Sequence, residues 1–272
     1  MLLLEFLAGG LANAVTSALL NPLDIAKTRM QTAPAALSLR GTLSALHAEG
    51  GLRAVFLPGM AASVIREMIY SGAKAGLYVP LRGHFGGESP AAKVAAALCT
   101  GTLGSLLANP IDVVKIRLMA DARRYPSTAA AIPIIFRAEG LAGFYRGLAP
   151  STLRGACVSA GELATYDVAK GLLREALFSG RDGVALHVAA SLVTGCVAAC
   201  VAAPFDLIKA RAMSSARPEG IASVLRQLAR EGALPLGLFR GLVPAYLRLG
   251  PHALIAFPIF EQLRRLFGLE YL

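Results

Sequence analysis

The same short pattern closes three long apolar stretches of this chain. Residues 6–23, 94–111 and 183–205 contain no Asp, Glu, Lys or Arg, and each of these stretches runs into Pro-x-Asp-x-x-Lys-x-Arg. The three copies are Pro22–Arg29, Pro110–Arg117 and Pro204–Arg211. Their prolines are 88 and 94 residues apart, so the sequence is a threefold repeat. Any fold must therefore be built from three copies of one unit.

The apolar stretches have the length of membrane spans. The shorter two have 18 residues, which is about 27 Å of α-helix. With their flanks they can cross a hydrocarbon core of about 30 Å. Only 16% of the chain is charged, and its mean hydropathy is +0.57, whereas a soluble domain carries about a quarter charged residues. The sequence predicts a membrane protein.

Further residues keep the register of the repeat. A glycine follows each proline by 37 residues, an arginine by 44 and an aromatic residue by 56. These are Gly59, Gly147 and Gly241, then Arg66, Arg154 and Arg248, then Tyr78, Tyr166 and Phe260. Acid–glycine pairs lie between, at Glu49, Glu139 and Glu231. Each repeat is thus predicted to hold a first span, a polar linker and a second span.

This organisation predicts an all-α membrane protein. We expect one domain over residues 1–272, with repeats at 1–88, 89–180 and 181–272. Six transmembrane helices would surround a central cavity in threefold pseudosymmetry, with short surface helices in the linkers. Glycine at the end of each linker helix is a usual stop signal. Six spans place both termini on one side of the membrane.

Charge and cysteine content limit the classes of function that this chain can have. The net charge is +10, but the basic residues are spread along the chain without the runs that a nucleic-acid surface needs, so we expect no nucleic-acid partner. Attraction to anionic lipid and an anion pathway both account for the charge. The four cysteines lie in apolar stretches and form no metal-ligand pattern. No nucleophile–base pair or phosphate-binding glycine loop is present, so we expect no enzyme.

These elements resemble the mitochondrial carrier family over essentially the whole chain. The family pattern joins Pro-x-acid-x-x-base, acid-Gly, aromatic-base-Gly and a late aromatic-acid-x-x-base. The third element is present as Tyr145–Gly147 and Phe239–Gly241, but repeat one has Leu57–Gly59 with Pro58 at the basic position. The context of the arginines is similar to the dicarboxylate, oxoglutarate and uncoupling-protein branch. The resemblance implies an antiporter that works as a monomer in the mitochondrial inner membrane, without a cofactor.

The resemblance also assigns two gates. On the matrix side it implies three ion pairs, with Gln31 as a brace beneath them: Asp24–Lys115, Asp112–Lys209 and Asp206–Lys27. Pro22, Pro110 and Pro204 would kink the helices. On the cytosolic side it implies Asp167–Arg264 and Glu261–Arg82, beside Tyr78, Tyr166 and Phe260. Val79 replaces the third acid, so we expect Lys170 to lack its partner and this gate to be the weaker one.

The equal depth of Arg66, Arg154 and Arg248 predicts a binding site. Charges in mid-membrane usually face a cavity or a partner, and guanidinium groups bind carboxylates in a bidentate fork. We therefore expect a small anionic substrate with more than one acidic group. Other residues assigned to this site are Glu67, Lys74, Gly155, Glu162, Leu249 and His252. Arg146, Gly147, Arg240 and Gly241 are assigned to anionic lipid head groups, such as bound cardiolipin.

The sequence favours exchange of dicarboxylates or 2-oxoacids, and it leaves three alternatives. The first is an uncoupling-type proton-leak carrier. The second is an amino-acid carrier, because the acid of Glu67 suits an amino group where the branch usually has a neutral amide. The third is a non-transporting, carrier-derived adaptor.

Overall fold

The structure, a computed structural model, describes residues 2–86, 89–176, 183–215 and 220–268, and within them it contains helices and no strand. Repeat one holds α1 (Leu2–Leu19), α2 (Asn21–Thr32), α3 (Leu39–Phe56) and α4 (Met60–His84). Repeat two holds α5 (Pro90–Ala120), α6 (Thr128–Glu139), the 3₁₀ turn η1 (Leu141–Tyr145) and α7 (Leu148–Ala176). Repeat three holds α8 (Val184–Ser214), α9 (Ile221–Arg230), η2 (Leu236–Phe239) and α10 (Leu242–Leu266).

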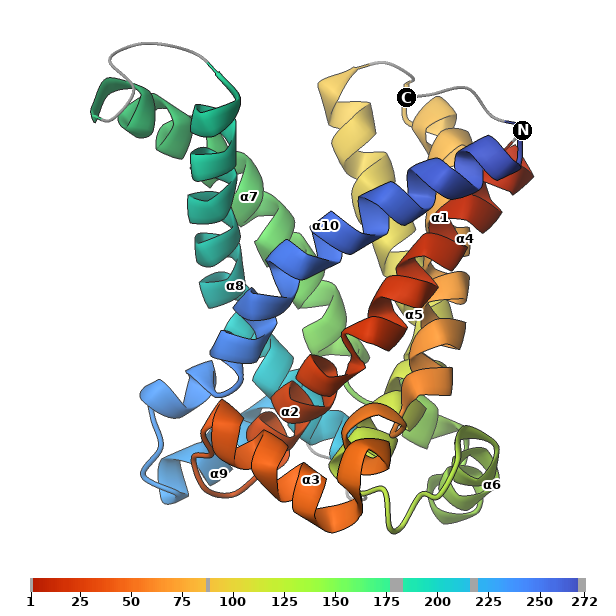
Figure 1. The fold of residues 1–272 in the computed structure, drawn as a ribbon, viewed down its shortest axis with the longest axis vertical. Helices are drawn as coiled ribbons and strands as arrows, with labels where there is room; N and C mark the ends of the chain where they lie inside the picture. Colours follow the sequence, from red (N-terminus) through yellow and green to blue (C-terminus); the bar gives the residue numbers. More distant parts are fainter. Residues whose placement is uncertain (1, 87–88, 177–182, 216–219, 269–272) are drawn as a thin grey trace.

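The long helices form a closed ring. Around it, α1 contacts α4, α4 contacts α5, α5 contacts α7, α7 contacts α8, α8 contacts α10, and α10 returns to α1. In Figure 1 the helices converge toward α3, α6 and α9, which lie together at one end, and diverge toward the other end, where both termini lie. We call these the linker end and the terminal end. The expected six-helix, all-α architecture is confirmed.

Large apolar side chains point outward from the ring, as they do in lipid rather than in water. Ala8 and Ala12 of α1 are buried, whereas Leu11, Val15 and Leu19 of the same helix are exposed. Without a hydrophobic force between helices in lipid, small residues at the contacts let the backbones approach closely. Among the described residues, three helical stretches are long and apolar enough to span a membrane by length and composition: Ala95–Ala120, Leu186–Ser214 and Leu236–Leu266.

The signature prolines act differently in the three repeats. In repeat one the helix breaks at Leu20, and α2 begins with Pro22 in its first turn, where a missing N–H costs nothing. Pro110 and Pro204 lie inside the unbroken helices α5 and α8. The predicted kink is thus a helix break in repeat one.

Glycine begins the second long helix of each repeat for a steric reason. Gly59 precedes α4 with a φ of 71°, in the left-handed region, which other residues adopt at a cost. A Cβ there would also lie 3.0 Å from Cγ of Met119 in the next repeat. Gly147 and Gly241 have the same φ region and face Met213 and Gln31. Tight seams between repeats therefore require the threefold glycine.

An asparagine before two of the prolines ties the first helix to the linker. The amide of Asn109 donates to the carbonyl oxygens of Phe144 at 2.7 Å and Arg146 at 3.1 Å. Asn21 makes the equivalent bonds to Phe56 and Pro58. These bonds satisfy carbonyl groups at the turn that leads into α7 or α4.

We expect Asn109→Ala to lower the thermal unfolding midpoint of the purified protein in detergent by about 2–10 °C. Leaving buried carbonyl groups without donors costs about 1–3 kcal/mol, and each kcal/mol shifts the midpoint of a chain this size by about 2–4 °C. Asn13→Ala in α1 is the control, since none of the described contacts involves its side chain. Equal midpoints for the two variants would show that the asparagine bonds do not stabilise the fold.

Candidate functional site

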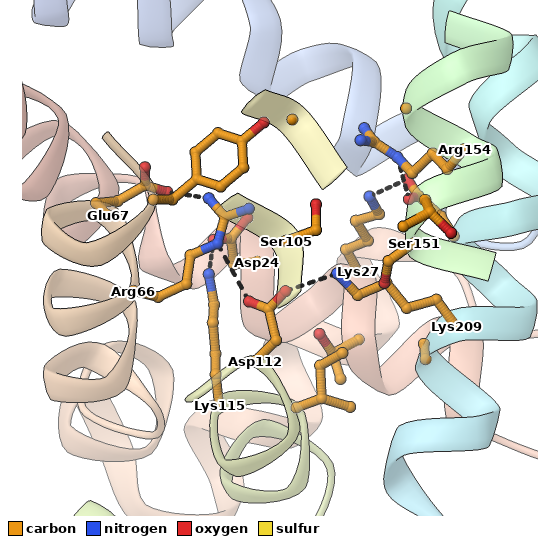
Figure 2. A pocket seen from close by; sticks show the side chains of 18 of the residues that line it. Asp24, Lys27, Arg66, Glu67, Ser105, Asp112, Lys115, Ser151, Arg154 and Lys209 are labelled. Atoms are coloured by element: carbon orange, nitrogen blue, oxygen red, sulfur yellow. Dashed lines mark hydrogen bonds and ion pairs between the residues drawn. The ribbon is translucent and has the colours of Figure 1, made fainter. Parts of the chain in front are cut away.

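The described residues enclose a central cavity of about 360 Å³ among the long helices. Its charged lining comes from two helices of every repeat, which we call the first helices (α2, α5 and α8) and the second helices (α4, α7 and α10). The first helices supply Asp24, Lys27, Asp112, Lys115, Asp206 and Lys209, and the second helices supply Arg66, Glu67, Arg154 and Arg248. Figure 2 labels all of these except Asp206 and Arg248 and shows them gathered around the cavity. The threefold repeat thus brings distant residues of the sequence to one place.

Three lysine–aspartate ion pairs join the repeats at the linker-end floor of the cavity. Each links neighbouring first helices: Lys115–Asp24 at 3.0 Å, Lys209–Asp112 at 2.7 Å and Lys27–Asp206 at 2.6 Å. The pairing is the one that the family resemblance implied. Aspartate and lysine three residues apart lie on one helix face, so each helix offers an acid to one neighbour and a base to the other.

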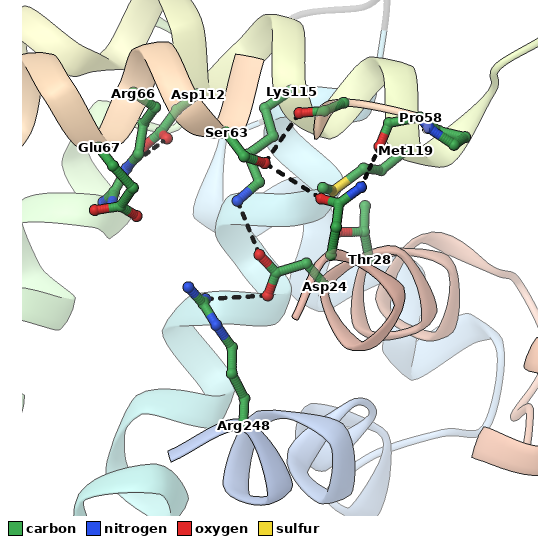
Figure 3. A network of polar contacts seen from close by, with 12 residues as sticks. Asp24, Thr28, Pro58, Ser63, Arg66, Glu67, Asp112, Lys115, Met119 and Arg248 are labelled. Atoms are coloured by element: carbon green, nitrogen blue, oxygen red, sulfur yellow. Dashed lines mark hydrogen bonds and ion pairs between the residues drawn. The ribbon is translucent and has the colours of Figure 1, made fainter. Parts of the chain in front are cut away.

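Each aspartate also binds an arginine from a second helix. Asp24 lies between Lys115 and Arg248, whose Nη1 is 3.0 Å away (Figure 3). Arg66 Nε lies 3.1 Å from Asp112, and Arg154 Nε lies 2.6 Å from Asp206. The three arginines were expected to form a ring that faces a ligand. In the structure they line the cavity and also contact the aspartates at its floor.

Two of the arginines keep part of their guanidinium groups open to the cavity. The side chains of Arg154 and Arg248 are 41% and 27% exposed, and each makes one ion pair among the described residues, to Asp206 and Asp24. Both line the cavity, so both guanidinium groups are suited to bind an anion that enters it.

Several predicted residues can be placed only in part. Gly155 lines the cavity. His252 is not among the described residues that line it. The side chains of Lys74, Tyr78, Glu162, Asp167 and Leu249 lie outside what the structure describes.

Of the two ion pairs expected at the terminal-end gate, Glu261–Arg82 lies within the described side chains, whereas Asp167 lies outside them. No ion pair joins Glu261 to Arg82 in this part of the structure, and the Glu261 Oε2 atom is buried without a hydrogen-bond partner. Arg264 stacks over Phe260 at 5.7 Å, and the Tyr166 hydroxyl lies 2.8 Å from His187. Lys170 is not without an interaction in the structure, and a weaker gate as the effect of Val79 stays a prediction.

A second set of arginines clamps the seams at the linker end. Arg117 donates its Nε to the Met213 carbonyl of the next repeat at 2.9 Å and forms a fork with Glu139 of its own linker at 2.6 and 2.8 Å. Arg29 and Arg211 repeat this pattern with Glu49 and Glu231. Sequence reasoning did not find these clamps, although the arginine has the same place in all three signatures.

Arg146 and Arg240, assigned to lipid from the sequence, join these clamps. Arg146 lies 2.7 Å from Glu139 and donates to the Ser215 carbonyl at 2.7 Å. Arg240 lies 3.3 Å from Glu231 and donates to the carbonyls of Ala33 and Pro34. Both guanidinium groups thus contact protein acceptors. Repeat one has Pro58 here, so Glu49 has no second arginine of this kind.

The clamps hold two linker carboxylates in their ionised form. A hydrogen bond from Arg29 lowers the pKa of Glu49, and one from Arg211 lowers that of Glu231. Their contribution to stability is therefore present above the pKa of an unfolded glutamate and is lost as the pH falls through the lowered folded values.

The sequence analysis also missed the uncharged lining. Tyr70, four residues after Arg66, holds that guanidinium 4.7 Å from its ring centroid. Gly101, Thr102 and Ser105 of α5 line the cavity as well. They lie two and three helical turns before Asp112 on the same face, a periodicity that would have identified them.

Comparison with known proteins agrees with this architecture of six long helices around a charged cavity. The model of the mitochondrial carrier protein family matches the chain three times, over residues 2–89, 86–177 and 180–271. The chain belongs to this family, whose members are transporters and not enzymes.

Individual relatives differ in what their names describe. The chain is 33% identical to mitochondrial citrate transporter F of Aspergillus niger, over 97% of this chain and 90% of the relative. It is 33% identical to mitochondrial uncoupling protein 1 of Arabidopsis thaliana, over 90% and 87%. It is 28% identical to the substrate carrier family protein ucpB of Dictyostelium discoideum, over 98% and 97%.

Proposed function

We propose that this chain exchanges small carboxylates, such as dicarboxylates or 2-oxoacids, across the mitochondrial inner membrane. The observation that carries the proposal is the pair of arginines that line the cavity, Arg154 and Arg248, each of which pairs with a single carboxylate among the described residues. Guanidinium groups bind carboxylates with two parallel hydrogen bonds. A cavity of about 360 Å³ suits a small molecule.

Alternating access follows from the two ends of the ring. The lysine–aspartate pairs hold the first helices together at the linker end, whereas the helices diverge at the terminal end (Figure 1). We infer that the linker end faces the matrix and that the cavity receives substrate from the cytosolic side. Opening toward the matrix then requires the three lysine–aspartate pairs to separate while the long helices approach one another at the terminal end.

A substrate carboxylate competes with an aspartate for the same arginine. Arg154 contacts Asp206 and Arg248 contacts Asp24, and these contacts tie second helices to the floor. A bound dicarboxylate that draws both guanidinium groups away releases these ties. Substrate binding therefore breaks contacts that hold the linker end closed. This gives the substrate a different interaction with the closed and the open state, which any ligand-driven shift between two conformations requires.

The test is uptake by liposomes that contain the purified protein. Labelled succinate, malate, 2-oxoglutarate, aspartate, phosphate and ADP are offered to vesicles that hold the same unlabelled compound. We expect uptake of at least one dicarboxylate or 2-oxoacid, and none in vesicles without protein. Uptake confined to phosphate, aspartate or ADP would overturn the proposal.

A second candidate is proton leak, because relatives at 33% identity are named uncoupling proteins. The same liposomes distinguish the two functions when a pH-sensitive dye is enclosed. A protein-dependent proton flux that a purine nucleotide inhibits, without carboxylate exchange, would establish the uncoupling type.

A further inference from the structure

The three arginines of the cavity are not equivalent. Arg154 and Arg248 each contact one carboxylate, Asp206 and Asp24. Arg66 contacts two, with Nε 3.1 Å from Asp112 and Nη1 2.8 Å from Glu67, and it also stacks on Tyr70. Arg66 is thus the one whose donors are largely occupied by protein, and neither of the other second helices has an acid directly after its arginine.

The acid that occupies Arg66 is itself placed in the cavity. The Glu67 side chain is 10% exposed and lines the same cavity as the three lysine–aspartate ion pairs. A buried carboxylate is costly unless it is paired, and Arg66 is the partner that the described residues give it. Figure 2 shows Glu67 on the side of Arg66 that faces away from Asp112. The two carboxylates therefore flank one guanidinium group.

The charged side chains that line the cavity carry a net positive charge. Three lysines and three arginines face three aspartates and Glu67, so the formal charge of the empty cavity is +2. Without Glu67 it would be +3. Inside a protein, where the effective dielectric constant is far below that of water, one charge at this range changes the binding of an anion substantially.

We propose that Glu67 sets the charge selectivity of this carrier, so that it takes dicarboxylate dianions in preference to tricarboxylate trianions. The proposal rests on carboxylate exchange as the function. Glu67 neutralises Arg66, and Arg154 and Arg248 remain to bind one carboxylate each. A third carboxylate has no open cation to meet and would lie near the negative charge of Glu67.

The test compares two anions on the intact protein in liposomes. Unlabelled succinate or citrate competes with the uptake of labelled succinate at a slightly alkaline pH, where both are fully ionised. The readout is the ratio of the half-inhibiting concentrations, citrate over succinate. In the wild type we expect a ratio well above one. In Glu67→Gln, which keeps the shape and loses the charge, we expect the ratio to fall about tenfold, or ~1.4 kcal/mol.

Two variants serve as controls. Glu175→Gln makes the same change of charge at an exposed position near the end of α7, and Glu67→Asp keeps the charge within the cavity. Both are expected to retain the ratio of the wild type. If uptake by Glu67→Gln is too low to measure, the rise in unfolding temperature with each anion gives the same comparison, because a ligand stabilises the state that it binds.

The outcomes separate this inference from the function on which it rests. A wild type that takes up no carboxylate overturns the function. A wild type that takes up succinate, with a ratio unchanged in Glu67→Gln or equally changed in Glu175→Gln, overturns only the role of Glu67. Aspartate uptake that is present in the wild type and lost in Glu67→Gln also overturns it, because Glu67 would then bind a substrate amino group.

Discussion

Arg154→Ala and Arg248→Ala are each expected to lower carboxylate exchange in liposomes at least 30-fold while the protein remains folded. Truncating one partner of a buried charge pair typically costs 2–5 kcal/mol of binding, which corresponds to a factor of about 30 or more. Folding should survive, because Asp206 keeps Lys27 and Asp24 keeps Lys115 after the arginine is removed.

The experiment measures initial exchange rates over a range of substrate concentrations. Arg226→Ala, on the exposed face of α9, is the control and should exchange at the rate of the wild type. Arg154→Lys keeps the charge and loses the planar fork, so we expect it to recover only part of the activity. Near-normal exchange by either alanine variant would show that the substrate does not bind these arginines.

Glu139→Gln is expected to destabilise the protein far more than Glu49→Gln. Glu139 is 3% exposed and pairs with Arg117 and Arg146, so its loss leaves two cations without their carboxylate. Removing one partner of a buried pair costs about 3–5 kcal/mol. Glu49 is 36% exposed and pairs with Arg29, and an exposed pair contributes about 1 kcal/mol or less.

Thermal unfolding of the purified variants in detergent gives the comparison. We expect the midpoint to fall by about 10 °C in Glu139→Gln and by no more than about 3 °C in Glu49→Gln. The two variants carry the same chemical change at equivalent positions of two repeats, so each is the control of the other. Equal shifts would mean that burial and the second arginine do not determine the strength of the clamp.

Threefold repetition explains why the floor of the site could be predicted from sequence. A single Asp24–Lys27 motif fits any helix end at a membrane surface. Three copies at one register define three neighbouring helix faces, on which the acids and bases of adjacent repeats can meet, and the family resemblance says which acid meets which base. The ring of ion pairs follows from this symmetry, as does the common depth of the three arginines.

The contacts of long side chains could not be predicted in the same way. The register places Arg248 above the floor, but whether its guanidinium group reaches Asp24 depends on rotamers and on how far the helices converge. Arg146 was assigned to lipid through the family resemblance, and its contact with Glu139 depends on a linker path that no spacing in the sequence predicts. The hydroxyl-bearing face of α5 was overlooked because Ser105 lies in a stretch defined by its lack of charge.

The departures from symmetry carry the properties specific to this chain. Pro58 removes the second arginine from one clamp, and Glu67 adds a carboxylate to one arginine of three. Differences of this kind between repeats are where the substrate specificity of a symmetric transporter can be encoded.

Counter-exchange measures the central claim most directly. Liposomes that contain the protein are loaded with labelled succinate and then diluted into buffer with or without unlabelled dicarboxylate. An exchanger that uses one cavity alternately from both sides should release label only when external dicarboxylate is present, and Arg154→Ala should not release it. Release at the same rate into buffer without dicarboxylate, or no release in either buffer by the folded wild type, would contradict carboxylate exchange by this protein.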